Sequence, residues 1–150
     1  MNWKHTTITA LCLCLAGGAV SMASAADEPQ VVRAAMMKKV GGAMGALAGI
    51  AKGEKPYDAA VVKASLTTME DVAKHFPDQF PKGSETGFNT EASPKIWEDM
   101  ATFKTKAKAL ETAAATQLAT LPADQAGVGA AMKAIGATCG DCHQAFRLKK

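Results

Sequence analysis

The chain has 150 residues, of which 48% are hydrophobic and 21% are charged, and its formal net charge is only +3. A charge this small gives no indication that the protein binds nucleic acid or a membrane surface. The length suits one domain with one hydrophobic core, although only 5% of the residues are aromatic, so that core would contain little aromatic bulk.

The N-terminal segment has the three parts of a secretory signal peptide. Lys4 is its only charged residue, residues 8–20 form an uncharged and mainly apolar run, and Ala23-Ser24-Ala25 is a small-x-small cleavage site. The apolar run is too short to cross a bilayer, which takes about 20 apolar residues, so a membrane anchor is the weaker interpretation. We therefore expect residues 1–25 to be removed and residues 26–150 to form the mature domain, most simply in a bacterial periplasm.

The first half of the mature chain predicts two helices, because its hydrophobic residues recur at steps of three or four. The first helix is expected over residues 28–51 and the second over residues 58–75, with a Gly-Glu-Lys-Pro break at 53–56. Their expected buried faces comprise Val32, Met36, Val40, Ala43 and Leu47 in the first helix, and Val62, Leu66, Met69, Ala73 and Phe76 in the second.

The second half predicts an irregular segment and two more helices. Residues 76–92 contain two prolines and two glycines and are expected to be irregular. Ser93-Pro94 suits a helix start, and the third helix is expected over residues 94–118, with a fourth over residues 123–148. Four amphipathic helices with mostly short connections predict an all-α fold, an antiparallel four-helix bundle.

The sequence Cys139-Gly140-Asp141-Cys142-His143 has the Cys-x-x-Cys-His spacing of c-type haem attachment. On a helix, two cysteines three residues apart lie on one face, so each can form a thioether with one haem vinyl group. His143 then supplies an imidazole nitrogen to the iron on the proximal side. The motif therefore predicts one covalently bound haem c.

Two other interpretations of the two cysteines are weaker. A thioredoxin-type redox motif follows a strand, and no strand pattern precedes Cys139. A structural zinc site takes four protein ligands, and completing one here would require His75 at an arbitrary spacing. Cys12 and Cys14 fall inside the expected signal peptide and are not counted as ligands.

The second axial ligand of the iron is not determined by periodicity alone. His75 ends the second predicted helix and is expected on the surface. The methionines of the mature chain are mostly expected to fill the core. They are Met36, Met37, Met44, Met69, Met100 and Met132.

The mature chain resembles the class II cytochromes c, which include the cytochromes c prime. The resemblance rests on CGDCHQAFR near the C-terminus, on RAAMMKKVGGAM in the first predicted helix, and on FPKGS and TEASPKIWEDMATF in the middle of the chain. It covers essentially all of residues 26–150. It implies a left-handed four-helix bundle with haem bound between the helices.

The resemblance also implies roles for particular residues. Arg33 matches an arginine near the haem propionates, and Met37 matches the distal residue that faces the iron. Thr90 and Glu91 match a region that contacts the haem edge, and Arg147 matches an arginine close to the proximal histidine. The alternatives are a solvated helix face for both arginines and an ordinary capping role for Thr90 and Glu91.

Met37 separates two functions that the resemblance allows. If its thioether binds the iron, the protein is a six-coordinate, low-spin single-electron carrier, and a thioether ligand favours a raised reduction potential. If it does not bind, the iron is five-coordinate and accepts nitric oxide or other small gases. MKKVGGAM and PKIWEDMATF look more like the methionine-ligated branch, so we expect electron transport with redox partner proteins.

Catalysis is a weaker interpretation. A haem peroxidase needs a general base and a charge-stabilising group on its distal side, and the predicted distal stripe of Met37, Val40, Gly41 and Met44 offers neither. The protein is therefore expected not to be an enzyme. Class II bundles often pair through their first two helices, and the small residues Gly41, Gly42, Gly45 and Ala46 would permit a homodimer or leave room for haem.

Overall fold

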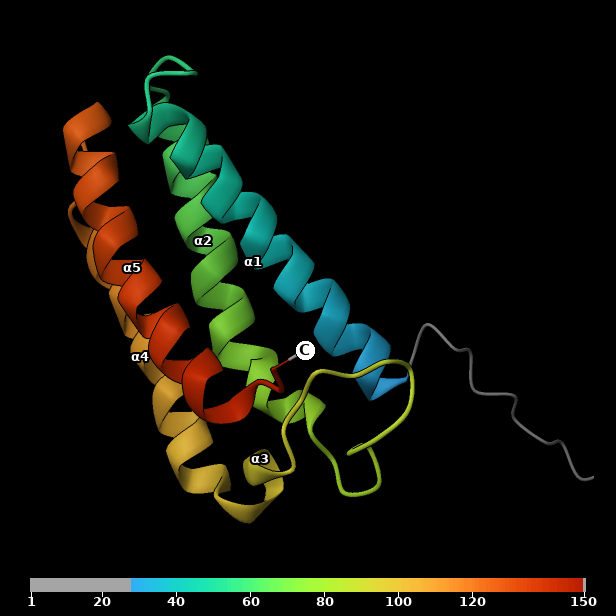
Figure 1. Ribbon diagram of the computed structural model, residues 1–150. Coiled ribbons are helices and arrows are strands. Elements are labelled where there is room, and N and C mark those ends of the chain that lie inside the picture. The colour runs from blue at the N-terminus through green and yellow to red at the C-terminus, as the bar shows by residue number, and fades with distance from the viewer. Residues whose placement is uncertain (1–27, 150) are drawn as a thin grey trace, which may run out of the picture.

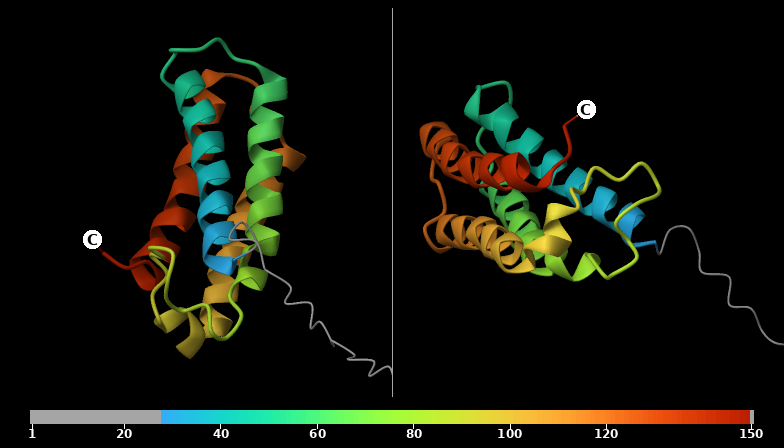
Figure 2. Two further views of the ribbon diagram at one scale, coloured as in Figure 1. Left: turned by 90° about the vertical axis from the view of Figure 1, so that its right-hand side faces the viewer. Right: turned by 60° about the horizontal axis from the view of Figure 1, so that its bottom comes forward.

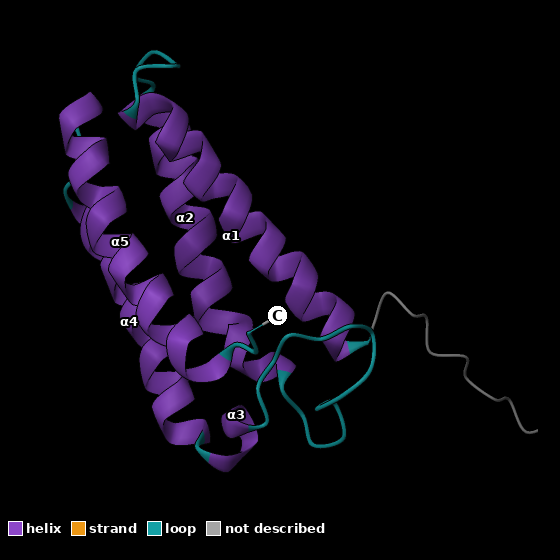
Figure 3. Ribbon diagram, in the orientation of Figure 1, coloured by secondary structure: helices purple, strands orange, loops and turns teal. Residues whose placement is uncertain are grey.

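The computed structural model describes residues 28–149, so the expected signal peptide, its cleavage site, Cys12 and Cys14 lie outside the described residues. The described part of the chain is helical and contains no β-strand (Figures 1 and 3). Its elements are α1 (Pro29–Ala51), α2 (Ala59–His75), the 3-10 helix η2 (Phe76–Gln79), α3 (Lys95–Glu98), α4 (Met100–Ala119) and α5 (Gln125–Phe146). No helix among the described residues is long and apolar enough to span a membrane.

The four long helices form the antiparallel bundle that the sequence predicts. Helix α1 packs against α2 and α5, and α4 packs against the same two helices from the other side. Residues 80–94 cross one end of the bundle, beside the first turns of α1 (Figure 2). The apolar positions of each predicted face point inward, as in Leu47, Leu66, Phe103 and Ile135, all at most 1% exposed.

The core divides into two clusters with different side chains. The aliphatic cluster comprises Val40, Ala43, Leu47, Ile50, Val62, Leu66, Met69, Val72, Ala114, Val128 and Ile135. The aromatic cluster comprises Phe80, Ile96, Phe103 and Phe146, with Phe76 and Trp97 packed against them. Ring centroids lie 4.7 Å apart for Phe80 and Phe103 and 5.4 Å apart for Phe103 and Phe146, in the edge-to-face arrangement that aromatic rings prefer. Four of the five phenylalanines therefore lie together at one end of the bundle.

The third predicted helix is not continuous, and in this respect the prediction was wrong. The chain leaves helical geometry at Asp99, with φ −135° and ψ 64°, so that α3 is a single turn and α4 begins at Met100. The Asp99 carboxylate accepts a hydrogen bond from the Thr102 amide at 3.1 Å and thereby caps α4. The hydrogen bonds from Thr102 also hold the pKa of Asp99 below its usual value. Aspartate competes well for such capping positions, and this explains a break that hydrophobic spacing does not reveal.

Asp124 caps α5, the helix that contains the Cys-x-x-Cys-His motif. Its carboxylate accepts a hydrogen bond from the Gly127 amide at 2.8 Å. We expect Asp124→Ala to lower the free energy of unfolding by about 1 kcal/mol, the usual effect of losing such a cap. Urea unfolding of the haem-bound protein would measure the change. Asp124→Asn keeps a capping oxygen and should unfold near the wild-type midpoint, so equal losses in both variants would contradict the capping role.

Candidate functional site

A cavity of about 650 Å³ opens between α1, α4, α5 and residues 88–92. Most of its lining is apolar. Every residue that the sequence analysis assigned to the site lines this cavity, although the residues come from three separate parts of the chain. They are Arg33, Met37, Thr90, Glu91, Cys139, Cys142, His143 and Arg147. The fold therefore brings the predicted residues together in one place.

Helix α5 supplies the thiols and the imidazole. Cys139 and Cys142 are three residues apart within one regular helix, so they lie on the same face, and neither forms a disulfide. Burial raises the pKa of each thiol. Burial also lowers the pKa of His143, with a smaller contribution from the positive charge of Arg147. A lowered pKa favours the neutral imidazole, the form that binds a metal.

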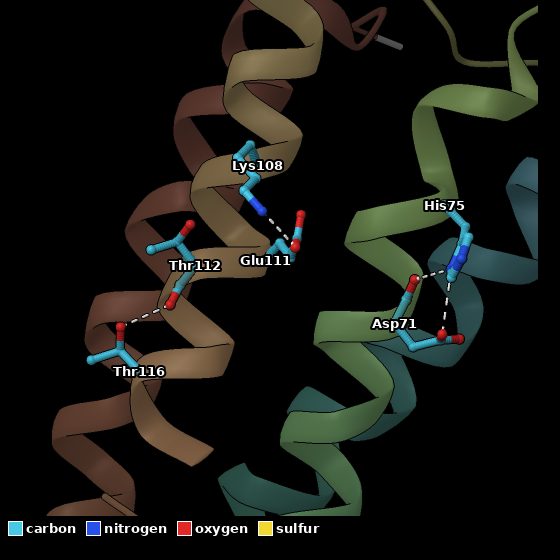
Figure 4. Close-up of polar contacts among 6 residues, drawn as sticks. All are labelled: Asp71, His75, Lys108, Glu111, Thr112 and Thr116. Carbon is cyan, nitrogen blue, oxygen red and sulfur yellow. Dashed lines mark hydrogen bonds and ion pairs between the residues drawn. The ribbon is translucent and has the colours of Figure 1, made fainter. Parts of the chain in front are cut away.

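His75 takes no part in this site. It does not line the cavity, and its side chain is exposed at the end of α2. Its Nδ1 lies 2.8 Å from the Asp71 carbonyl oxygen and 3.3 Å from the Asp71 carboxylate (Figure 4). The expectation of a surface histidine is confirmed. Within residues 28–149, no group of three or more His, Cys, Asp or Glu side chains is arranged to hold a metal ion.

Helix α1 supplies an apolar wall of the cavity. Met37, Val40, Gly41 and Met44 all line it, and none of them carries a titratable group. Met36, Met69, Met100 and Met132 are not part of the lining, and Met69 is fully buried in the aliphatic cluster. The structure thus reduces the six candidate methionines to two, Met37 and Met44.

Arg33 is buried rather than solvated, with 4% of its surface exposed, so the solvated-face alternative is wrong for this residue. Its Nη1 donates to the Gln79 carbonyl at 3.0 Å and to Ser84 Oγ at 2.9 Å. Its Nη2 donates to the Ser84 carbonyl at 2.9 Å and to Thr90 Oγ1 at 3.2 Å. The guanidinium carbon also lies 4.6 Å from the ring centroid of Phe80. Arg33 therefore ties residues 79–90 to α1, and burial lowers its pKa.

One polar atom of Arg33 has no hydrogen-bond partner among the residues that the structure describes. All the Nη contacts are made inside the chain, whereas the buried Nε has no hydrogen-bond acceptor. Other atoms of Arg33 line the cavity and give it a positive charge. An apolar cavity lined by two thiols, an imidazole and a cationic side chain matches haem, a largely apolar macrocycle with two carboxylates.

Glu91 and Arg147 form an ion pair at the edge of the cavity. The Nε of Arg147 donates to the Glu91 carboxylate at 2.7 Å, and the Arg147 side chain is 53% exposed. The backbone reinforces this contact, since the Leu148 amide donates to the Glu91 carbonyl at 2.8 Å and the Ser93 amide donates to the Phe146 carbonyl at 2.9 Å. The sequence analysis did not predict this pairing because it joins segments more than 50 residues apart.

Three further residues of the cavity wall were missed by sequence reasoning. Gln30 is buried and donates to the Thr86 carbonyl at 2.7 Å, and its position one turn before Arg33 on α1 was the available signal. Lys106 pairs with Asp141, inside the haem motif, at 2.6 Å. Phe88 lines the cavity from a turn whose conformation no local pattern indicated.

Comparison with known proteins identifies a family. Residues 28–147 match the family described as Cytochrome C'. A protein named cytochrome c-556 from Agrobacterium fabrum (strain C58) is 57% identical over 152 residues, covering 100% of each chain. The solved structure of cytochrome c' from Rhodopseudomonas palustris has a TM-score of 0.77 at 38% identity, over 82% of this chain and 98% of that one. Oxidised cytochrome c556 from the same species has a TM-score of 0.74 at 35% identity, over 82% and 98% of the two chains.

Proposed function

We propose that this protein is a single-electron carrier of the bacterial periplasm. The proposal starts from its family, because this chain belongs to the Cytochrome C' family of monohaem c-type cytochromes. Proteins of this family bind haem c covalently, and the chain has the two cysteines that this attachment requires. The observation that supports the proposal most directly is the convergence of the thiols, the imidazole, two methionines and a buried arginine on one apolar cavity.

We assign the covalent attachment to Cys139 and Cys142 and the proximal iron ligand to His143. Their position on consecutive turns of α5 supports this, because a thioether to each vinyl group would hold the macrocycle against the helix. The bound haem supplies an iron that alternates between the ferric and ferrous states. The protein contributes an apolar environment that excludes water and donors for the carboxylates.

We assign the distal ligand to Met37. The α1 wall supports a thioether ligand, since the residues from Met37 to Met44 that line the cavity are two methionines, a valine and a glycine, with no acid, base or other polar side chain among them. A thioether from Met37 would favour the ferrous state of the iron. The same absence of an acid-base group along this stripe argues against peroxidase chemistry.

The remaining polar residues are assigned to the haem edge. We propose that the positive charge of Arg33 stabilises a propionate, while its two Nη groups hold residues 79–90. Thr90 and Glu91 lie at the edge of the same cavity, but their side chains also bond to Arg33 and Arg147 respectively. We therefore propose that they act on the haem edge partly by positioning the two arginines.

We propose redox proteins as partners and a homodimer as the assembled state. Space for the second copy is available along α1, because a side chain added at Gly42 or Gly45 would meet nothing within 4 Å in this chain. Binding of nitric oxide or another small gas is the alternative function. The protein would have this gas-binding function if neither Met37 nor Met44 binds the iron.

The haem-containing protein tests the assignment in two measurements. Acid acetone, which extracts unattached haem, should leave the colour on the polypeptide because of the two thioethers. The ferric absorption spectrum should be low-spin, and the ferrous spectrum should be unchanged by carbon monoxide because both axial positions are filled. Extraction of the haem would contradict covalent attachment at Cys139 and Cys142. A five-coordinate spectrum with carbon monoxide binding would instead support the gas-binding alternative.

A further inference from the structure

Three consecutive residues at the edge of the cavity have positive φ angles. They are Gly87 at 91°, Phe88 at 49° and Asn89 at 52°, and the Thr90 amide donates to the Gly87 carbonyl at 3.0 Å. This is the pattern of a type I′ turn, whose two central positions both require positive φ. Glycine and asparagine adopt this conformation readily, whereas a bulky side chain such as phenylalanine rarely does. Phe88 is therefore the unusual residue of the turn.

Within residues 28–149, Phe88 belongs to neither core cluster, so packing in the core does not explain why phenylalanine occupies this position. Phe88 as a residue is 54% exposed, more than Tyr57, Val61 or Leu148, and it is the one phenylalanine outside the aromatic cluster. It nevertheless lines the cavity. Part of its exposed surface therefore borders the space that the cofactor fills, and a contact there would offset the unfavourable backbone conformation.

The turn is attached to α1 on both sides of Phe88. Before it, Gln30 Nε2 donates to the Thr86 carbonyl at 2.7 Å, and after it, Arg33 Nη2 donates to Thr90 Oγ1 at 3.2 Å. Both donors belong to buried side chains. These two contacts fix the turn relative to the α1 wall, so the position of Phe88 is determined by the fold and not by its own packing.

We propose that Phe88 covers the haem at the open edge of the cavity and raises its reduction potential by excluding water. This inference rests on the proposed function, since it requires haem in this cavity. The ferric centre carries one more positive charge than the ferrous centre, so water at the haem edge stabilises the ferric state more. An apolar ring at the edge therefore favours the ferrous state. It also limits the approach of small hydrophilic molecules.

Substitutions at Phe88 separate this role from a structural one. Phe88→Asn removes the ring and places at this turn position a residue that tolerates positive φ, so the variant should fold. Phe88→Leu keeps an apolar side chain without the ring. In the haem-bound proteins we expect the midpoint potential to be highest in the wild type, lower in Phe88→Leu and lowest in Phe88→Asn. The rate of reduction by ascorbate, corrected for the potential, should rise several-fold in Phe88→Asn.

Val61→Asn is the matched control, because Val61 is also an exposed apolar residue but lies on α2 and does not line the cavity. It should have the wild-type potential and rate. An unchanged or raised potential in Phe88→Asn would overturn the proposal, as would an equal fall in Val61→Asn. Failure of the haem assignment itself would be recognised separately, because the wild-type protein would then lose its colour in acid acetone.

Discussion

The Met37→Ala variant is expected to lose the low-spin ferric spectrum and to bind carbon monoxide in its ferrous form. The thioether of Met37 is the proposed distal ligand, and alanine has no group that could bind iron in its place. The midpoint potential should fall as well, because a methionine ligand favours the ferrous state. Absorption spectra of both oxidation states and a carbon monoxide titration would measure these changes.

Met44 provides the matched control for Met37. Both methionines lie on α1, both are partly buried, and both line the cavity. Met44→Ala should therefore keep the low-spin spectrum and remain unreactive towards carbon monoxide, despite a similar loss of side-chain volume. If Met44→Ala rather than Met37→Ala lost the low-spin spectrum and bound carbon monoxide, the distal ligand would be Met44. If both variants kept the wild-type spectrum, no methionine of α1 would be a ligand.

The Arg33→Met variant is expected to lower the free energy of unfolding by about 3 kcal/mol, because it removes charged donors from buried acceptors. Four hydrogen bonds to residues 79–90 disappear, and both the hydroxyl and the carbonyl oxygen of the buried Ser84 lose the donor that Arg33 supplies. The Ser84 hydroxyl keeps only the bond that it donates to the Pro81 carbonyl. The contact of the guanidinium with Phe80 is lost as well. Urea unfolding of the haem-bound protein, followed by circular dichroism, would measure the effect.

Arg147→Met tests whether burial is the reason for this loss. Arg147 also belongs to the candidate site and forms an ion pair, but its side chain is 53% exposed. An exposed pair contributes less than about 1 kcal/mol, so this variant should unfold near the wild-type midpoint. Arg33→Lys should lie between wild type and Arg33→Met, because it keeps the charge but has fewer donors. Equal losses for Arg33→Met and Arg147→Met would contradict the proposed anchoring of residues 79–90.

Hydrophobic spacing predicted the four long helices because each buries one continuous apolar face. The expected bounds of α1 and α2 differ from the structure by one residue at their N-terminal ends, and both helices end as predicted, at Ala51 and His75. Hydrophobic spacing did not predict the helix break at Asp99, where a single side-chain cap interrupts a continuous apolar pattern. It also missed the 3-10 turn Phe76–Gln79, since a segment this short has no periodicity to read.

The residues that line the cavity were predicted better than the contacts that hold them in place. The Cys-x-x-Cys-His motif is local and could be read directly, and the resemblance to class II cytochromes indicated Arg33, Met37, Thr90, Glu91 and Arg147. Long-range contacts were not predictable in this way. The bonds of Arg33 to Ser84 and of Arg147 to Glu91 join residues 51 and 56 positions apart. Phe88 was missed for the same reason, because its conformation depends on bonds made by α1.

Helix α1 divides along its length into a part that meets the cavity and a part that holds the core. Met37 lies in the first part and is only partly buried, whereas Leu47 and Ile50 lie in the second and are at most 2% exposed. If Met37 binds the iron as proposed, a substitution at position 37 changes the coordination of the iron while removing few contacts from the core. During evolution, one bundle could then acquire or lose a distal ligand by a single codon change, and selection could alter the chemistry of the haem without rebuilding the protein around it.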